Sequence, residues 1–233
     1  MIKLNKKISQ AIVIEGFPGF GLIGTIATEF LIEHLQCEKI ATHYFSELPA
    51  TIAIHESKIV DPVGIYYNKK YNIVIIHSIS GAQGIEWKAA DLVLDIAKQV
   101  KAKEVISIEG VGSPGSSQSR VFYFTNNLKK VELLKKAGLS PLKEGIIMGV
   151  TSAIMLKCPV PLTCIFAETE SNLPDSKAAA GVIQVLDQYL NLAVDPKPLL
   201  KTAEKFEQKL KGIMEQNKSA QVERDKKQMS YVG

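Results

Sequence analysis

The chain has 233 residues, 46% of them hydrophobic, with 28 Lys and Arg against 24 Asp and Glu. This length and composition predict one domain with a sizeable core and a modest extension. No continuous apolar run follows the first lysines, and Lys157, Pro159 and Pro161 interrupt the most apolar stretch, residues 145–167. We therefore expect neither a secretory signal nor a membrane span, and we predict a cytoplasmic protein.

The excess positive charge lies near the C-terminus. From Lys197 to Gly233 there are nine Lys and Arg against five Asp and Glu, whereas residues 1–196 hold nineteen of each. A neutral body with a basic, aromatic-bearing extension is typical of a protein that contacts another assembly through that extension. Arginine occurs only at Arg120 and Arg224, and the lysines of the extension alternate with acids, so we predict no nucleic-acid partner.

The cysteines and histidines are scattered along the chain. Cys158 and Cys164 are six residues apart, with two prolines and no histidine between them, and Cys37 is distant in sequence. This spacing fits reduced thiols better than a disulfide framework or a zinc site. We therefore predict that the protein binds no metal.

Hydrophobic periodicity predicts the elements of the body in chain order. They are a strand at 11–15, a helix at 21–35, strands at 40–45, 51–55, 59–67 and 71–77, a helix at 87–100, strands at 104–108 and 121–125, helices at 127–136 and 149–156, a strand at 162–167, and a helix at 175–192. Asp175 can cap the last of these helices, and no helix fits between Leu48 and Gly84. Strands that alternate with helices predict an α/β fold, with an antiparallel patch inserted at residues 48–77.

A final amphipathic helix follows the break at Asp195, Pro196 and Pro198. Its apolar residues recur at steps of four and three: Leu199, Ala203, Phe206, Leu210 and Ile213. The pattern spans about two heptads, fewer than a coiled coil needs, so this face either packs on its own domain or forms a seam between subunits. We therefore expect an α/β domain at 1–194, an amphipathic helix at 195–218 and a flexible tail at 219–233, whose polar composition favours disorder.

A glycine motif separates the first predicted strand from the first helix. Gly19, Gly21 and Gly24 match GxGxxG, a pattern typical of dinucleotide binding. The inserted Gly16-Phe17-Pro18 lengthens the turn, however, and further strands stand where a second strand–helix unit should follow, so we predict no cofactor. The alternatives are a helix N-terminus that holds an anion, or glycines that let Phe17 and Phe20 project from an exposed loop.

Acidic residues follow several of the predicted strands. In an open α/β sheet, ligands bind beyond the carboxyl ends of the strands, where Glu15, the Ser78–Gly84 loop, Glu109 and Glu168-Thr169-Glu170 should converge. Glu109 and Glu168 could form an acid/base pair there. Acids at strand ends more often cap loops, and no GxSxG, Walker or HExxH motif accompanies these. We expect a pocket at this edge and leave a catalytic pair as the alternative.

Five segments of the chain occur in a distinctive order: Glu15–Gly24, Gly84–Trp87, Met148–Ala153, Pro174–Ala180 and Val194–Glu207. Together they resemble the proteasome assembly chaperone family, the type represented by its second eukaryotic member and by archaeal homologues. The resemblance covers residues 10–210 and implies a homo-oligomer with a phosphorylase/hydrolase-like fold, in which helices flank a mixed sheet. It also implies help in assembly of the proteasome α-ring, with no established catalysis.

The same resemblance implies a role for the last residues. Some members of the family, and proteasome activators, end in a hydrophobic residue, a penultimate Tyr and one last residue, which insert between α subunits. Here the penultimate residue is Val232, so only a shifted form of that motif is available. The implied partner contacts are Met229, Tyr231, Val232 and Gly233, to which we add Phe17 and Phe20 on the predicted loop.

These observations predict a proteasome assembly chaperone-like protein that is not an enzyme. A homo-oligomeric body and a C-terminal tail would bind proteasome α subunits or another assembly factor. The alternative is a nucleotide- or small-molecule-binding enzyme that uses the strand-end pocket, with Gly19, Gly21 and Gly24 at its cofactor. Predicted labels that link the family to ATP-grasp carboligases favour this second interpretation.

Overall fold

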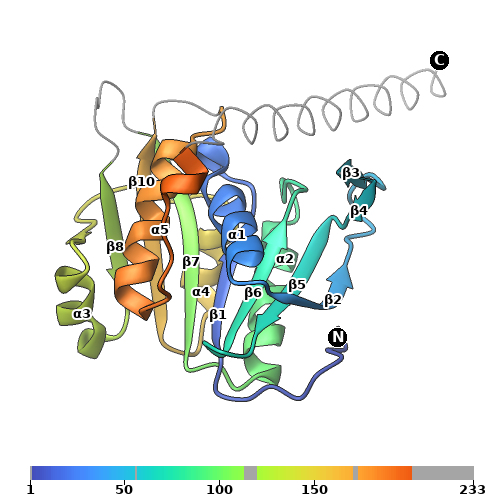
Figure 1. Cartoon of the computed structure of the whole chain (residues 1–233), viewed down its shortest axis with the longest axis horizontal. Helices are drawn as coiled ribbons and strands as arrows, with labels where there is room; N and C mark the ends of the chain where they lie inside the picture. The colour runs from blue at the N-terminus through green and yellow to red at the C-terminus, as the bar shows by residue number, and fades with distance from the viewer. Residues whose placement is uncertain (1, 56, 113–119, 170–172, 201–233) are drawn as a thin grey trace.

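A central eight-stranded sheet organises the protein (Figure 1). The computed structural model describes residues 2–55, 57–112, 120–169 and 173–200. The strand order is β2-β5-β6-β1-β7-β10-β8-β9. Four neighbouring strands are parallel: β6 (Ile73–Ser78), β1 (Ile12–Gly16), β7 (Glu104–Gly112) and β10 (Leu162–Thr169).

The two sides of the sheet are completed by strands in other orientations. On one side β5 (Val63–Asn68) is antiparallel to β6, and β2 (Glu38–His43) is antiparallel to β5. On the other side β8 (Val121–Thr125) is antiparallel to β10, and the short β9 (Ser140–Pro141) pairs with β8. The predicted α/β class, a mixed sheet flanked by helices with an antiparallel patch, is therefore confirmed.

Two helices cover each face of the sheet (Figure 1). Helices α1 (Ile23–His34) and α5 (Ser176–Leu190) pack on one face, and α2 (Glu86–Gln99) and α4 (Val150–Lys157) on the other. Alternate strand residues point to opposite faces, so Ile14 joins the core under α1 and α5 while Val13 joins the core under α2 and α4. No helix in the described part of the chain is long and apolar enough to cross a membrane.

The predicted cap of α5 is confirmed. The Asp175 side chain accepts a hydrogen bond from the backbone N–H of Ala178, at 2.9 Å. This bond satisfies one of the N–H groups that a helix N-terminus leaves without an internal partner. The helix ends where Asn191 adopts a left-handed conformation, with φ of 55°.

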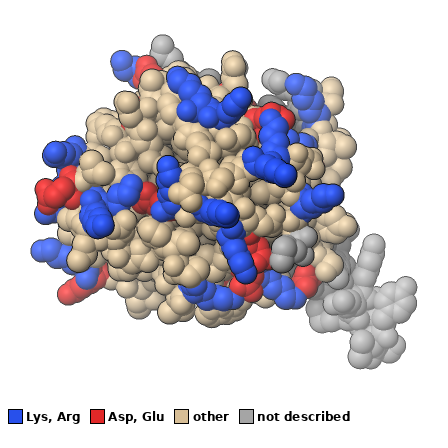
Figure 2. Space-filling model, turned by 90° about the horizontal axis from the view of Figure 1, so that it is seen from below, with Lys and Arg blue, Asp and Glu red and all other residues tan. Residues whose placement is uncertain are grey.

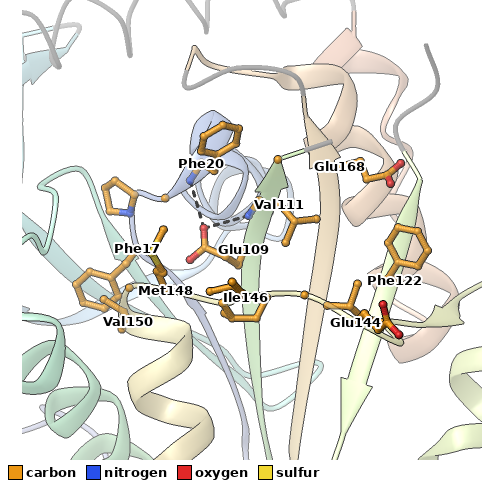
Figure 3. Close-up of a pocket in the computed structure, with 18 of the residues that line it drawn as sticks. Phe17, Phe20, Glu109, Val111, Phe122, Glu144, Ile146, Met148, Val150 and Glu168 are labelled. Carbon is orange, nitrogen blue, oxygen red and sulfur yellow. Dashed lines mark hydrogen bonds between the residues drawn. The ribbon is translucent and has the colours of Figure 1, made fainter. Parts of the chain in front are cut away.

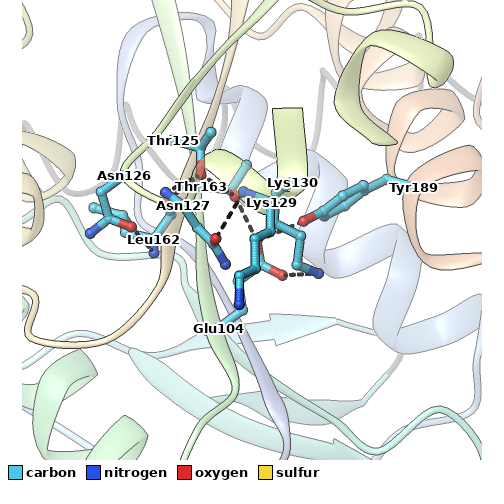
Figure 4. A network of polar contacts seen from close by, with 9 residues as sticks. All are labelled: Glu104, Thr125, Asn126, Asn127, Lys129, Lys130, Leu162, Thr163 and Tyr189. Carbon is cyan, nitrogen blue, oxygen red and sulfur yellow. Dashed lines mark hydrogen bonds and ion pairs between the residues drawn. The ribbon is translucent and has the colours of Figure 1, made fainter. Parts of the chain in front are cut away.

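A buried polar network lies at the amino-terminal end of β7 (Figure 4). The side chain of Glu104 is 1% exposed, and its Oε1 accepts hydrogen bonds from Thr163 Oγ1 at 2.6 Å and Tyr189 OH at 2.7 Å. Its Oε2 lies 3.1 Å from the ammonium of Lys130. Burial and the adjacent carboxylate raise the pKa of the Tyr189 hydroxyl above its ordinary value. The network joins β7, β10, α5 and the 3₁₀ turn η2 (Leu128–Lys130), and it supplies the buried acid with a cation.

Two predicted elements are divided in the structure. The strand expected at 59–67 is two strands, β4 (Lys58–Val60) and β5, separated at Asp61-Pro62, because proline has no N–H to donate. β4 pairs instead with β3 (Ala53–His55) in a separate hairpin. The helix expected at 127–136 is η2 followed by α3 (Val131–Lys136). The prediction that no helix lies between Leu48 and Gly84 is confirmed for the described residues.

The start of the C-terminal helix packs on the body. Helical backbone begins at Lys197, and Leu199 is 1% exposed within the core under α1 and α5. For Leu199, the structure has the own-domain packing that the sequence left as one alternative. The other predicted seam residues, Ala203, Phe206, Leu210 and Ile213, and the predicted tail contacts, Met229, Tyr231, Val232 and Gly233, lie outside the described residues.

Candidate functional site

A pocket of about 860 Å³ opens at the carboxyl ends of the parallel strands (Figure 3). It lies beyond the carboxyl ends of the neighbouring strands β1 and β7, with the start of α1 on one face of the sheet and the start of α4 on the other. Open α/β sheets bind ligands beyond the carboxyl ends of their strands. The predicted strand-end pocket is thus confirmed. Glu109, Glu168, Ala82 and Gln83 line it, and Glu170 lies outside the described residues.

The carboxyl group of Glu109 sits on the glycine-rich turn between β1 and α1. Its Oε1 accepts hydrogen bonds from the backbone N–H of Phe20 at 3.3 Å and of Gly110 at 3.0 Å. A Cβ at Gly19 would lie 1.8 Å from that same oxygen, so a side chain there would displace the carboxyl group from this position. Gly21 has φ of +67°, a left-handed conformation that glycine adopts without strain. The turn therefore binds a carboxyl group, that of Glu109, which belongs to the protein itself.

Gly24 has a packing role. A Cβ there would lie 2.7 Å from the carbonyl oxygen of Ile108 and 3.1 Å from the Cα of Gly16. The absence of a side chain lets α1 approach β1 and β7 closely, as the third glycine of the dinucleotide motif does. The turn has the close packing of the dinucleotide motif, but the N–H of Phe20 already binds Glu109. That N–H is therefore not available to a pyrophosphate, which argues against the dinucleotide interpretation.

Two hydroxyl groups connect Glu109 to a second buried acid, Glu15. Thr151 Oγ1, in the first turn of α4, lies 3.3 Å from Glu109 Oε2 and 2.8 Å from Ser107 Oγ. Ser107 in turn donates a hydrogen bond to Glu15 Oε1. The result is a continuous chain of carboxyl and hydroxyl groups from the pocket into the core. The sequence analysis missed Ser107 and Thr151, although Thr151 falls within one of the family-like segments.

Both acids of this chain favour the protonated form. Burial raises the pKa of Glu15 to about 7, and its hydrogen bonds only partly oppose the shift. Burial, with the charge of Glu15 as a second cause, raises the pKa of Glu109 to about 8. Desolvation of this kind disfavours a charged carboxylate that has no cation beside it. In the described part of the chain, neither acid forms an ion pair.

The predicted acid/base pair of Glu109 and Glu168 is replaced by other partnerships. Glu168 binds Arg120 through two hydrogen bonds, from Nε at 2.8 Å and from one terminal nitrogen at 2.7 Å. Glu109 is linked to Glu15 instead. The guanidinium at the pocket is therefore already neutralised by a bidentate carboxylate.

Apolar side chains form most of the remaining wall (Figure 3). Phe17 is 4% exposed and belongs to the core under α2 and α4, so the prediction that it projects from an exposed loop is wrong. Phe20 is half-buried at the pocket. The other large apolar residues of the lining are Val111, Phe122, Leu142, Ile146, Ile147, Met148 and Val150. The glycine turn and the insertion that lengthens it thus each place one aromatic residue, Phe20 and Phe17, at the pocket.

The thiols and other metal-binding side chains are dispersed. Cys37, Cys158 and Cys164 are free, and burial raises the pKa of Cys37 to about 11 and that of the other two above the ordinary value. The thiols are therefore protonated at neutral pH. Within the described ranges, no three His, Cys, Asp or Glu side chains are grouped so that they could hold a metal ion.

Surface charge is mixed on the face seen from below (Figure 2). Lys and Arg side chains lie in several separate groups there, with acidic and uncharged side chains between them. Exposed ion pairs of the molecule include Lys6 with Glu38 and Lys135 with Glu132. Such pairs are partly screened by water and contribute little to stability.

Comparison with known proteins places this architecture in a family. The PAC2 family matches residues 13–214. An uncharacterized protein of Methanocaldococcus jannaschii is 28% identical over 218 residues, which are 92% of this chain and 90% of that protein.

Solved structures of other proteins share this architecture. PbaA of Pyrococcus furiosus, described as an archaeal homolog of proteasome-assembly chaperone, is similar with a TM-score of 0.82 at 29% identity, over 95% of this chain and 100% of that one. PbaB of the same organism, described as an archaeal proteasome activator, shares the fold with a TM-score of 0.74 at 22% identity, over 92% and 98%. Because the family match spans most of the chain and the architecture agrees, the protein belongs to the PAC2 family.

Proposed function

We propose that this protein is a proteasome assembly chaperone-like protein that binds proteasome α subunits, or a related assembly factor, as a homo-oligomer in the cytoplasm. The observation that carries the proposal is the likeness to PbaA at 29% identity over nearly the full length of both chains. PbaA is described as an archaeal homolog of a proteasome-assembly chaperone. Function lies in particular sites and not in the fold as a whole, so the proposal also depends on surfaces of this chain.

The β3–β4 hairpin supports a role in protein binding. Ile54 and Ile59 are direct cross-strand partners and are 73% and 64% exposed, and Ile52 is also exposed. The hairpin stands apart from the main sheet (Figure 1). Grouped apolar side chains on a surface mark sites of protein–protein contact. We assign the hairpin to self-association.

The C-terminal segment supplies further contacts in this proposal. Residues 1–194 form the body, 195–218 a helix that begins by docking Leu199 on that body, and 219–233 a tail. The helix residues beyond Leu199 form the subunit seam, and the tail residues Met229, Tyr231, Val232 and Gly233 contact the client. Phe20 at the pocket remains a proposed contact, whereas Phe17 is buried and is no longer proposed as one.

The proposal includes no catalysis. Glu109 is tied to two backbone N–H groups, and Glu168 is tied to Arg120. In this proposal these carboxyl groups hold the glycine turn and Arg120 in place and transfer no proton to a substrate.

Native mass spectrometry of isolated α subunits from the same organism tests the proposal. We expect mixed complexes of the α subunits with this protein, and a faster appearance of α-rings than in its absence. The absence of any mixed complex at micromolar concentrations of both proteins would remove the chaperone role.

A further inference from the structure

Glu109, which lines the pocket, and Glu15, which is linked to it in the core, differ from two other acids of the sheet, Glu104 and Glu168, which are paired with cations. At the opposite end of β7, Glu104 has the ammonium of Lys130 at 3.1 Å (Figure 4). Glu109 and Glu15 have only hydroxyl and N–H partners among the described residues. Buried acids in proteins are paired with cations or stay protonated. Glu109, at the pocket end of the sheet, therefore has no cationic side chain paired with it among the described residues.

Oxygen Oε2 of Glu109 is the atom left to meet a ligand. Oε1 already accepts two backbone N–H groups, whereas Oε2 has one contact, Thr151 Oγ1 at 3.3 Å. Figure 3 shows the carboxyl group among Phe20, Val111 and Met148, in the pocket whose lining it helps to form. A carboxylate oxygen can accept more than one hydrogen bond, so Oε2 has spare capacity.

The wall beside Glu109 suits an aliphatic chain. Phe17, Phe20, Val111, Ile146 and Met148 present apolar surface, and the volume of about 860 Å³ exceeds what one short chain needs. Methionine and aromatic side chains adapt well to flexible methylene chains. We infer that this pocket binds the ammonium end of an unbranched aliphatic amine, with Glu109 Oε2 as the anionic partner and the apolar wall around the methylene groups.

The charges at the pocket argue against an anionic ligand. Its acids are Glu86, Glu109, Glu144 and Glu168, and its basic residues are Arg120 and Lys143. Arg120 is held by Glu168 in a bidentate pair. In the glycine turn, the N–H of Phe20, which could bind a phosphate, is bound to Glu109. The carboxyl group of Glu109 also stands at this turn, so the pocket favours an ammonium ion over a phosphate or carboxylate.

Binding of the amine is coupled to the release of a proton. Because the pKa of Glu109 is raised to about 8, its carboxyl group is mostly protonated at pH 7, and a bound ammonium favours the ionised form. The groups that face the Glu109 carboxyl are Glu15 from β1, Thr151 from α4 and the backbone of Phe20. Farther from it lie Cys164 on β10 and the charged residues of the pocket rim: Glu86, Arg120, Lys143, Glu144 and Glu168. Among these, Glu15 titrates near pH 7 and opposes ionisation of Glu109, so both carboxyl groups enter the pH dependence.

The amine can come from two sources that share this chemistry. One is a free alkylamine or diamine, and the other is the lysine side chain of a bound protein. The inference does not rest on the proposed chaperone function, because it concerns the isolated chain and needs no α subunit.

Isothermal titration calorimetry of the full chain tests the inference. The probes are n-butylamine, a linear diamine and a lysine blocked at both backbone ends, with n-butanol and butyrate as chains of equal length that lack the cation. We expect n-butylamine to bind at least tenfold more tightly than either control, with close to one proton released at pH 7 in buffers of different ionisation enthalpy. The dissociation constant should fall about tenfold for each unit by which the pH rises towards pH 8, and it should stay constant above pH 8. Binding of the blocked lysine identifies a protein side chain as an admissible source, and binding of the free amines alone identifies a small molecule.

Two variants complete the test. Glu109→Gln keeps the acceptor for the two N–H groups but cannot ionise, and we expect it to weaken amine binding at least tenfold and to abolish the pH dependence. Glu132→Gln removes an exposed acid on α3 and should change neither. Equal binding by Glu109→Gln, or butylamine no tighter than butanol, would overturn the inference. If the Glu109 variant fails to fold, the number of protons that the unaltered chain releases on binding n-butylamine still tests the inference, and no release would overturn it.

Discussion

Glu109 gives the dinucleotide-like glycine motif an internal partner. Its carboxyl group accepts a hydrogen bond from the backbone N–H of Phe20, in the turn whose N–H groups bind a pyrophosphate in nucleotide-binding proteins. The absence of a side chain at Gly19 leaves room for Oε1, which lies where a Cβ would be. The same residue pattern therefore serves an internal contact.

A substitution at Gly19 tests this contact. The backbone there, with φ of −131° and ψ of −155°, is one that any residue adopts, so Gly19→Ala isolates the clash with Glu109. We expect the displaced carboxyl group to lower the free energy of unfolding by about 1–3 kcal/mol. In a Glu109→Ala background the same change should cost less than half as much. Urea unfolding of the four proteins measures the coupling, and additive effects would contradict the close contact.

The raised pKa values of Glu15 and Glu109 predict a pH dependence of stability. The folded protein keeps protons that the unfolded chain loses near pH 4.5, so this stabilisation is complete below that pH and is lost as pH rises through about 7 and 8. Each group contributes at most about 1.4 kcal/mol per pH unit across its window. Glu109→Gln cannot ionise and should gain stability relative to the unaltered chain between pH 5 and pH 8. A difference between the two proteins that stays constant with pH would refute the shift of Glu109.

At the scale of elements, the polar network of Glu104 fixes how η2 meets the sheet. Lys130 pairs with Glu104, and its ammonium also lies 5.1 Å from the centre of the Tyr189 ring. We expect Lys130→Met to destabilise the fold by about 2–4 kcal/mol, since it leaves a buried carboxylate without its cation. Lys135→Met, which removes an exposed pair one turn later, is the matched control and should cost less than about 0.5 kcal/mol. Thermal unfolding that ranks the two variants equally would show that the network is dispensable.

The β3–β4 hairpin is the element that we assign to self-association. Replacement of the exposed pair Ile54 and Ile59 by lysine puts two charges on the proposed contact without disturbing the buried core. Light scattering should then report a mass near the 25.5 kDa of one chain, against a multiple of it for the unaltered protein. Leu128→Lys, at an exposed position on η2, is the control. If the hairpin variant keeps the mass of the unaltered protein, the hairpin is not the contact between subunits, and the C-terminal seam becomes the candidate.

Several elements could be read from the sequence because their signals are local. Asp175 caps α5 as its position before an apolar periodic run predicts, and the strands at 104–108 and 162–167 lie within β7 and β10. The division at Asp61-Pro62 was missed because apolar residues continue on both sides of it. Local patterns identify an element more reliably than they identify its ends.

The site shows where sequence reasoning stops. The meeting of acids at one sheet edge follows from the α/β pattern, and Glu15 and Glu109 do converge. The choice of partners depends on Thr151 in α4 and Ser107 in β7, which only tertiary packing brings together. Phe17 was misplaced for the same reason: an aromatic residue between glycine and proline reads as a loop, and the loop packs inward.

At the scale of the whole molecule, the α/β body has an exposed apolar hairpin, which we propose as a protein contact, and a pocket whose lining does not include that hairpin. Family membership and the likeness to PbaA cover nearly the full chain. The exposed hairpin and the C-terminal segment are the parts assigned to partners, whereas the pocket is lined from within the body. Binding to α subunits should therefore survive loss of the pocket acid and fail on loss of the contacts outside it.

The most direct measurement is surface plasmon resonance on immobilised proteasome α subunits, with the full chain, a chain truncated after Lys218, and Glu109→Gln. We predict that the full chain and Glu109→Gln bind equally, and that truncation weakens binding at least thirtyfold, because a buried aromatic anchor such as Tyr231 contributes about 2 kcal/mol or more and several tails on one oligomer add avidity. Equal binding by the truncated chain would remove the tail from the interaction. No binding by the full chain would contradict the central claim that this protein recognises proteasome α subunits.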